Sequence, residues 1–120
     1  MSFDVNSTSY EDYVQVNASG DCSLPQIIEF IDVVNDIAAR AGRDRVLIDI
    51  RDVEGIPSEA DLFFAGKRIA EVFGSRLKAV VINRPERITR LGELTAVNRG
   101  ARFFATGSET EALDWLLDHR

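Results

Sequence analysis

The sequence predicts an α/β domain with a mainly parallel sheet, an antiparallel hairpin at its start and about four helices. The run from Arg45 to Arg51 has four apolar residues among the five from 46 to 50, three of them β-branched. A short apolar run that ends at Asp52 and Gly55 is typical of a strand buried on both faces. Helical spacing begins after Pro57, and two more strand–helix alternations follow. Such alternation predicts parallel strands joined by right-handed crossovers.

The predicted hairpin occupies residues 3–6 and 13–17, where apolar and polar side chains alternate. The polar segment from Ser7 to Asp12 predicts the turn between these strands. Gly20 and Asp21 are predicted to end the second strand.

The first helix is predicted to begin at Ser23, with Pro25 early in the helix and Gln26 completing a capping box. Gly42 is expected to end it in the left-handed conformation. Apolar residues recur on one side of this helix: Ile27, Ile31, Val34, Ala38 and Ala41.

The second helix is predicted from Ser58 to Phe73, with Gly74 ending it and a buried strand over residues 78–83. The side chains expected to share one side are Leu62, Ala65, Gly66, Ile69 and Phe73.

A third helix is predicted to follow residues 84–86 and to run to Asn98, and a short strand is predicted over residues 101–105. Ser108 and Glu111 form a predicted capping box for a last helix. The apolar residues expected on one side of the third helix are Ile88, Leu91, Leu94 and Val97, and those of the last are Ala112, Leu113, Leu116 and Leu117.

Composition indicates one domain over residues 1–120, in the cytoplasm. The chain is 45% hydrophobic and 28% charged, as in soluble globular proteins. A single cysteine, Cys22, excludes an intrachain disulfide and a multi-cysteine metal site, and favours a reducing compartment. The start lacks a signal-peptide pattern and no apolar run has membrane-spanning length. A net charge of −6 disfavours nucleic-acid binding.

Four stretches resemble the SpoIIAA-like group of the STAS (sulphate transporter and anti-sigma-factor antagonist) superfamily, also described as STAS/SEC14-like. They are Asp44–Arg51, Pro85–Thr89, Asn98–Arg102 and Glu111–Leu116, and with the hairpin they span almost the whole chain. The resemblance implies a β/α superhelix whose members bind partner proteins, nucleotides or lipids and rarely catalyse.

The resemblance also directs attention to Ser58. In anti-sigma antagonists a serine at the start of the helix after the central strand is phosphorylated, within an Asp-Ser-(Ser/Thr)-Gly motif. Only Ser58 corresponds here, and it lacks the acidic residue before it and the glycine after it. The alternative role is helix capping, with Asp61 near the positive end of the helix dipole.

Carboxylates gather near the end of the central strand at Asp49, Asp52 and Glu54. Such a group could hold Mg²⁺ or supply an acid/base pair. No histidine, phosphate-binding loop or activated nucleophile accompanies it, so pairing with Arg45 or Arg51 is favoured. We therefore predict no catalytic residue, metal or cofactor.

Arg84, Arg87 and Arg90 surround the predicted start of the third helix. Free N–H groups, the helix dipole and guanidinium donors together favour an anion, so these residues are a candidate anion site. The alternative is a solvated face neutralised by Glu86 and Glu93.

Phe63 and Phe64 cannot both face one core, because adjacent helical residues point about 100° apart. Either another segment covers Phe64, or this side of the helix is a self-association face or an apolar ligand groove. We predict a homodimer with Phe64 at or near the interface.

These observations predict a non-enzymatic interaction or regulatory module that binds itself or another protein. The alternative is a carrier of a small apolar or amphipathic ligand, such as a lipid, as the SEC14 likeness implies; a third is an enzyme that uses the Asp49/Asp52 loop. A flat apolar patch at Phe64 without a cavity would favour the module. An enclosed apolar cavity would favour the carrier, and a buried carboxylate pair with a raised pKa the enzyme.

Overall fold

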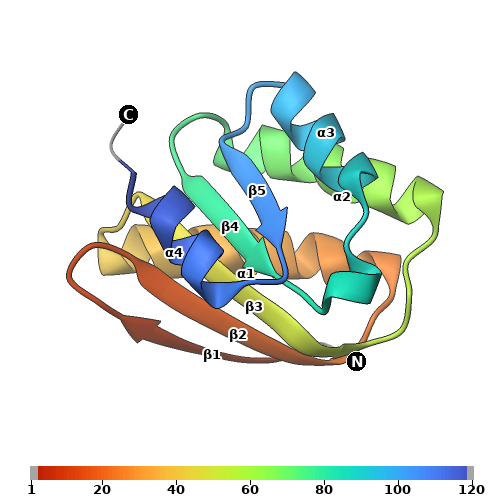
Figure 1. Ribbon diagram of the computed structural model, residues 1–120, viewed down its shortest axis with the longest axis horizontal. Helices are drawn as coiled ribbons and strands as arrows, with labels where there is room; N and C mark the ends of the chain where they lie inside the picture. The colour runs from red at the N-terminus through yellow and green to blue at the C-terminus, as the bar shows by residue number, and fades with distance from the viewer. Residues whose placement is uncertain (1–2, 119–120) are drawn as a thin grey trace.

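The computed structural model describes residues 3–118, which form one five-stranded sheet with helices on both faces (Figure 1). The strands lie in the order in which they occur in the chain: β1 (Asp4–Ser9), β2 (Val14–Asp21), β3 (Arg45–Glu54), β4 (Lys78–Ile82) and β5 (Phe103–Thr106). The β1–β2 pair is antiparallel and the other three pairs are parallel. The predicted mainly parallel sheet with an antiparallel hairpin is confirmed.

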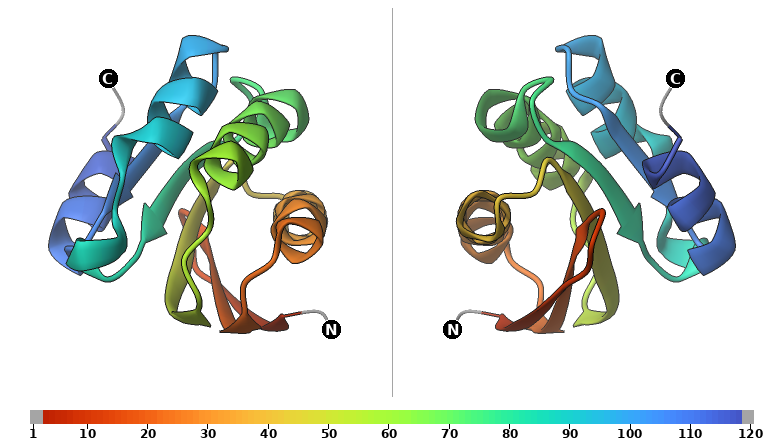
Figure 2. Two further views of the ribbon diagram at one scale, coloured as in Figure 1. Left: turned by 90° about the vertical axis from the view of Figure 1, so that its right-hand side faces the viewer. Right: turned by 90° about the vertical axis from the view of Figure 1, so that its left-hand side faces the viewer.

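Four α-helices and one 3-10 helix connect or follow these strands. They are α1 (Leu24–Ala41), α2 (Glu59–Phe73), the 3-10 helix η1 (Pro85–Arg87), α3 (Arg90–Asn98) and α4 (Glu109–Leu116). Figure 2 shows α1 and α2 on one side of the sheet and α4 on the other, with α3 beside α2. No helix among the described residues is long and apolar enough to cross a membrane.

The central strand β3 contributes to two separate hydrophobic layers, because successive side chains of a strand point to opposite faces. Val46 and Ile48 pack in the layer under α1 and α2, whereas Leu47 packs with Val80 and Leu116 in the layer under α4. The prediction that this strand is buried on both faces is confirmed.

The opening hairpin is longer than predicted, with its turn confined to the residues between β1 and β2. Tyr10 N–H donates to the Tyr13 carbonyl over 2.8 Å across that turn. The second strand ends at Asp21, as predicted, but Gly20 and Asp21 still belong to it: they pair with Val53 and Glu54, after a register shift between Asn17 and Ser19. The extended neighbouring strand supplies hydrogen-bond partners that local sequence does not reveal.

The two predicted capping boxes are not formed in full: Ser108 accepts the Glu111 N–H over 3.1 Å, but the Glu111 carboxylate accepts the Thr106 hydroxyl instead. Ser58 caps α2 as predicted, because its Oγ accepts the Asp61 N–H over 3.1 Å. The Asp61 carboxylate also accepts the Ser58 N–H over 3.4 Å, which completes a capping box that was not predicted from the sequence. Ser23 precedes α1 without a side-chain capping hydrogen bond, so the box with Gln26 is wrong. Gly42 ends α1 at φ 67°, as expected for a left-handed cap.

The third helix starts later than predicted, because the 3-10 turn η1 and two extended residues, Ile88 and Thr89, precede α3. α3 turns small residues toward α2. A Cβ added at Gly66 would lie 2.7 Å from the Gly92 carbonyl oxygen, so the two helices are in close contact there. The larger apolar side chains of α3 therefore face outward.

The layer under α4 is closed by Lys78, a nearly buried lysine at the start of β4. Its Nζ donates to the carbonyls of Trp115 and Asp118 over 2.6 and 2.9 Å and lies 4.6 Å from the centre of the Trp115 ring. These contacts satisfy free carbonyls at the end of α4 and fix the helix to the sheet.

Candidate functional site

The candidate arginines lie at the edge of the sheet where β3 and β4 end, and two of them share Glu54. Arg84 donates from Nε to the Arg51 carbonyl and from Nη2 to the Glu54 carboxylate, over 2.8 and 3.0 Å. Arg87 donates to the Val53 carbonyl, and its Nη2 lies 3.5 Å from the other Glu54 oxygen. Hydrogen bonding from Arg84 lowers the pKa of Glu54. Together these contacts hold the end of β3 against the β4–α3 connection.

Arg90 lies apart from this pair and acts on the outer strand β5. Its Nη1 donates to the Ala105 carbonyl over 2.9 Å and pairs with Glu93 over 3.1 Å. Glu93 in turn accepts the Ala105 N–H over 2.8 Å. Side chains of α3 thus satisfy the backbone N–H and carbonyl of Ala105 on the edge strand β5. Unpaired backbone groups on an edge strand otherwise tend to pair with another chain.

The predicted anion site of Arg84, Arg87 and Arg90 stays a prediction. α3 begins at Arg90, so the other two arginines precede its free N–H groups rather than surround them. An incoming anion would have to compete with Glu54 and Glu93 for these guanidinium groups.

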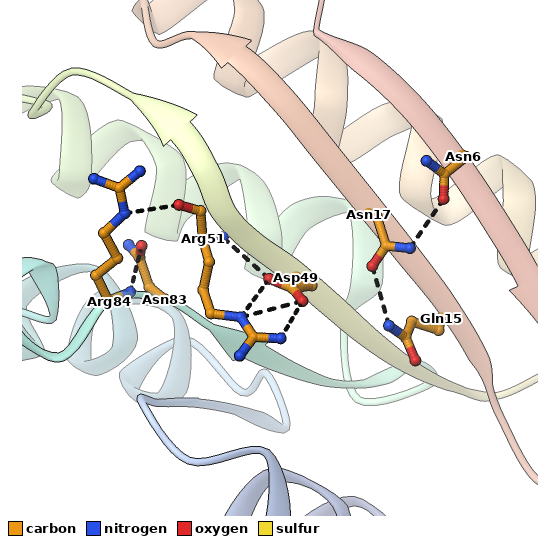
Figure 3. A network of polar contacts seen from close by, with 7 residues as sticks. All are labelled: Asn6, Gln15, Asn17, Asp49, Arg51, Asn83 and Arg84. Atoms are coloured by element: carbon orange, nitrogen blue, oxygen red, sulfur yellow. Dashed lines mark hydrogen bonds and ion pairs between the residues drawn. The ribbon is translucent and has the colours of Figure 1, made fainter.

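Asp49, the first of the candidate carboxylates, is paired with Arg51 (Figure 3), and Arg51 Nη2 lies 2.6 Å from its Oδ2. Burial raises the pKa of Asp49, but the hydrogen bonds and charge of Arg51 outweigh that effect and lower it. Asp52 is exposed. Neither Asp49 nor Glu54 has the raised pKa that the enzyme interpretation requires. Within residues 3–118 no cluster of three or more His, Cys, Asp or Glu side chains could hold a metal ion.

Polar side chains continue from this pair across the first strands of the sheet, as Figure 3 shows. Gln15 donates to the Asn17 side chain over 3.0 Å, and Asn17 donates to Asn6 over 2.9 Å. A surface of satisfied amides offers little apolar area to a partner. The candidate surfaces therefore lie on the other side of the sheet, where α1, α2 and α3 pack.

The first candidate surface is an outward-facing set of apolar side chains on two neighbouring helices. Phe64 and Leu94 are 47% and 52% exposed, and the rings of Phe63 and Phe64 lie 5.7 Å apart. The guanidinium of Arg99, at the end of α3, lies 5.3 Å from the Phe63 ring, which places α3 beside these rings. We call this surface the α2–α3 face, and it consists of Phe63, Phe64, Leu91, Leu94 and Val97.

The second candidate is an apolar cavity of about 210 Å³ between the sheet and the inner sides of α1, α2 and α3. Cys22 lies in its wall, and burial raises the pKa of the thiol, with Asp61 adding to the rise and Arg87 opposing it. The start of α1 therefore does not lower the pKa of Cys22 below its usual value. Most of the wall is apolar, including Ile27, Phe30, Ile48, Ile50, Leu62 and Ala65.

Sequence reasoning placed Phe63 and Phe64 at a surface but missed the rest of the α2–α3 face and the whole cavity. One sequence signal could have indicated the face. Gly92, Thr95 and Ala96 recur at helical spacing opposite to Leu91 and Leu94, a pattern that favours a helix packed by its small side. The cavity has no comparable signal, because it is the space that packed elements leave between them.

Ser58, the candidate regulatory residue, is exposed at the start of α2 and caps this helix. Capping accounts for its position, and phosphorylation there stays a prediction.

Comparison with known proteins is informative at the level of structure. No protein-family model matches the sequence, and no curated protein matches it significantly. An anti-sigma factor antagonist from Mycobacterium paratuberculosis has a similar structure, with a TM-score of 0.64 and 18% identity over 97% of this chain and 95% of that one. An uncharacterised protein with a SpoIIAA-like fold from Shewanella loihica gives a TM-score of 0.58 and 19% identity over 96% of this chain and 93% of that one. The chain therefore has a SpoIIAA-like fold.

Proposed function

We propose that this chain is a non-enzymatic interaction module that associates through the α2–α3 face. The observation that carries the proposal is the concentration of exposed apolar side chains on two adjacent helices. Of the eight large hydrophobic residues exposed in the described part of the chain, five belong to this face. Contiguous exposed apolar patches mark interaction sites far more often than single exposed residues do.

The fold supports this proposal in a general way. One protein of similar structure is named an anti-sigma factor antagonist, and that name describes action on another protein. Fold alone does not determine function, whereas an exposed apolar surface has a direct physical consequence for association. Aromatic side chains dominate the binding energy of many interfaces, and burying one ring contributes on the order of 2 kcal/mol.

The proposed partner is a second copy of the chain, with Phe64 at or near the interface. Soluble oligomers are most often two-fold symmetric dimers, in which one patch meets itself. Phe64 suits that role because it is the more exposed of the two rings, at 47% against 37%, whereas Lys67 and Arg99 lie 5.7 and 5.3 Å from the Phe63 ring.

Sedimentation over a range of protein concentrations tests the proposal. The wild type should become dimeric, and Phe64→Glu should remain a folded monomer because a buried carboxylate at the interface is strongly unfavourable. Val5→Glu, at an exposed position on β1, is the matched control and should dimerise like the wild type. A wild type that stays monomeric at high concentration would refute the homodimer.

A further inference from the structure

We infer that the apolar cavity beneath α1, α2 and α3 is a binding site for an uncharged small molecule that is mainly apolar and larger than benzene. Its volume is about 210 Å³. Protein interiors seldom contain voids larger than a water molecule, and an apolar cavity of about 150 Å³ is enough to bind benzene. An empty space of this size next to the central strand is therefore unusual, and it is large enough to hold a small molecule.

The composition of the wall determines that the occupant is apolar. Side chains from three elements enclose the space: Ile27 and Phe30 from α1, Ile48 and Ile50 from β3, and Leu62 and Ala65 from α2. A water molecule needs two to four polar partners, which this part of the wall does not offer. Burial of an apolar molecule here removes its surface from water at roughly 25 cal/mol per Å².

Polar wall residues lie together near the end of β4 and determine that the occupant is uncharged. Arg87 shares Glu54 with Arg84, and Glu93 is paired with Arg90, so each charged group in this part of the wall already has a partner of opposite charge. Asn83 accepts the Arg84 N–H over 2.8 Å, and within residues 3–118 nothing accepts a hydrogen bond from its amide nitrogen. A carbonyl or hydroxyl oxygen of the ligand is the group that would match this donor.

The mouth of the cavity lies at the loop between β3 and α2. Ile56 lines the cavity and is nevertheless 83% exposed, which places it between the interior and solvent. Cys22 adjoins the same loop, since its Cβ would lie 3.5 Å from a Cβ added at Gly55. The only cysteine of the chain is therefore a natural reporter of access to the cavity.

This inference does not depend on the proposed dimer. The cavity uses the inner sides of α2 and α3, whereas the α2–α3 face uses their outer sides. The protein can therefore dimerise without binding a ligand in the cavity, and it can bind a ligand there without dimerising.

Acetophenone is a suitable probe because it is uncharged, larger than benzene and carries one carbonyl; benzoate is a charged molecule of similar shape. Acetophenone should raise the melting temperature and slow the reaction of Cys22 with a thiol reagent. At ten times its Kd it leaves about one-tenth of the protein free, so labelling should slow about tenfold. Benzoate should do neither.

Ala65→Leu, which fills the cavity from α2, should fold with an unchanged or raised melting temperature and lose both responses to acetophenone. Ala60→Leu makes the same change at an exposed position of the same helix and should keep them. Ala105→Val fills the cavity from β5 and provides a second test if Ala65→Leu does not fold.

Failure of both filling variants to fold would show that the space is already packed and would overturn the inference. So would a wild type that does not respond to acetophenone, or a filling variant that responds as strongly as the wild type.

Discussion

Two neighbouring residues of β3 offer a direct comparison between a well-packed layer and one that borders a cavity. Leu47 and Ile48 are only 1% and 5% exposed, and they point to opposite faces of the sheet. Leu47 packs under α4, whereas Ile48 lines the cavity. Leu47 and Ile48 are therefore similarly inaccessible to solvent, but Ile48 has fewer packing partners than Leu47.

Truncation to alanine should reveal that difference. Such substitutions cost roughly 2–5 kcal/mol, made up of lost transfer free energy and lost contacts around the new void. Leu47→Ala should cost about 4 kcal/mol, because contacts disappear on every side of the removed atoms. Ile48→Ala should cost about 2 kcal/mol, because the side of Ile48 that faces the cavity has few contacts to lose.

Urea unfolding followed by far-ultraviolet circular dichroism measures both values, with an unchanged m-value as the condition for comparing them. If Ile48→Ala costs as much as Leu47→Ala, the space beside Ile48 is filled in solution. A cost below about 0.5 kcal/mol for either residue would show that β3 is not the core strand.

Three further predictions follow from single contacts. Gly66→Ala should lower the free energy of unfolding by about 1–3 kcal/mol, because the added Cβ would lie 2.7 Å from the Gly92 carbonyl oxygen. This cost should exceed the gain from alanine being the better helix former. Urea unfolding measures the change, and a gain in stability would contradict the close packing of α2 against α3. Asp49 has a lowered pKa in the folded protein, so its pairing with Arg51 stabilises the fold at neutral pH and is lost as the pH falls below the unfolded value of about 3.9. Asp49→Asn should therefore unfold more readily at pH 7 and lose less stability on acidification, and equal pH profiles would count against the pair. If the arginine anion site exists, sulphate should raise the melting temperature more than chloride at matched ionic strength, and Arg87→Ala should reduce that difference; an identical response of both proteins would exclude the site.

The fold was predictable from sequence because each element has its own local pattern. The run at Val46–Ile50 and the helix cap at Ser58 each identify an element from a few residues. Boundaries were less predictable where a neighbouring strand decides them, as at Gly20 and Asp21, whose partners lie more than thirty positions later in the chain.

The candidate sites were predictable only in part. An aromatic pair such as Phe63 and Phe64 necessarily has one ring outside the core, so local geometry indicated a surface there. The cavity depends on how α2 and α3 pack against each other and over the sheet, which involves contacts between distant residues such as Gly66 and Gly92. Ile56 illustrates the difficulty, because nothing in a Gly-Ile-Pro sequence tells whether the isoleucine covers a core or stands at an opening.

The sequential strand order has a consequence for folding during synthesis. Each parallel strand from β3 onward adds beside the one made before it, so the sheet can grow as the chain leaves the ribosome. Leu47 and Val80, however, have no helix over them until α4 has emerged, and Lys78 has no carbonyls to bind until then. The nascent chain therefore carries an uncovered apolar surface on one face of its sheet until α4 has been made. A ribosome-bound chain that ends before Glu109 should be the species that a hydrophobic-surface chaperone recognises.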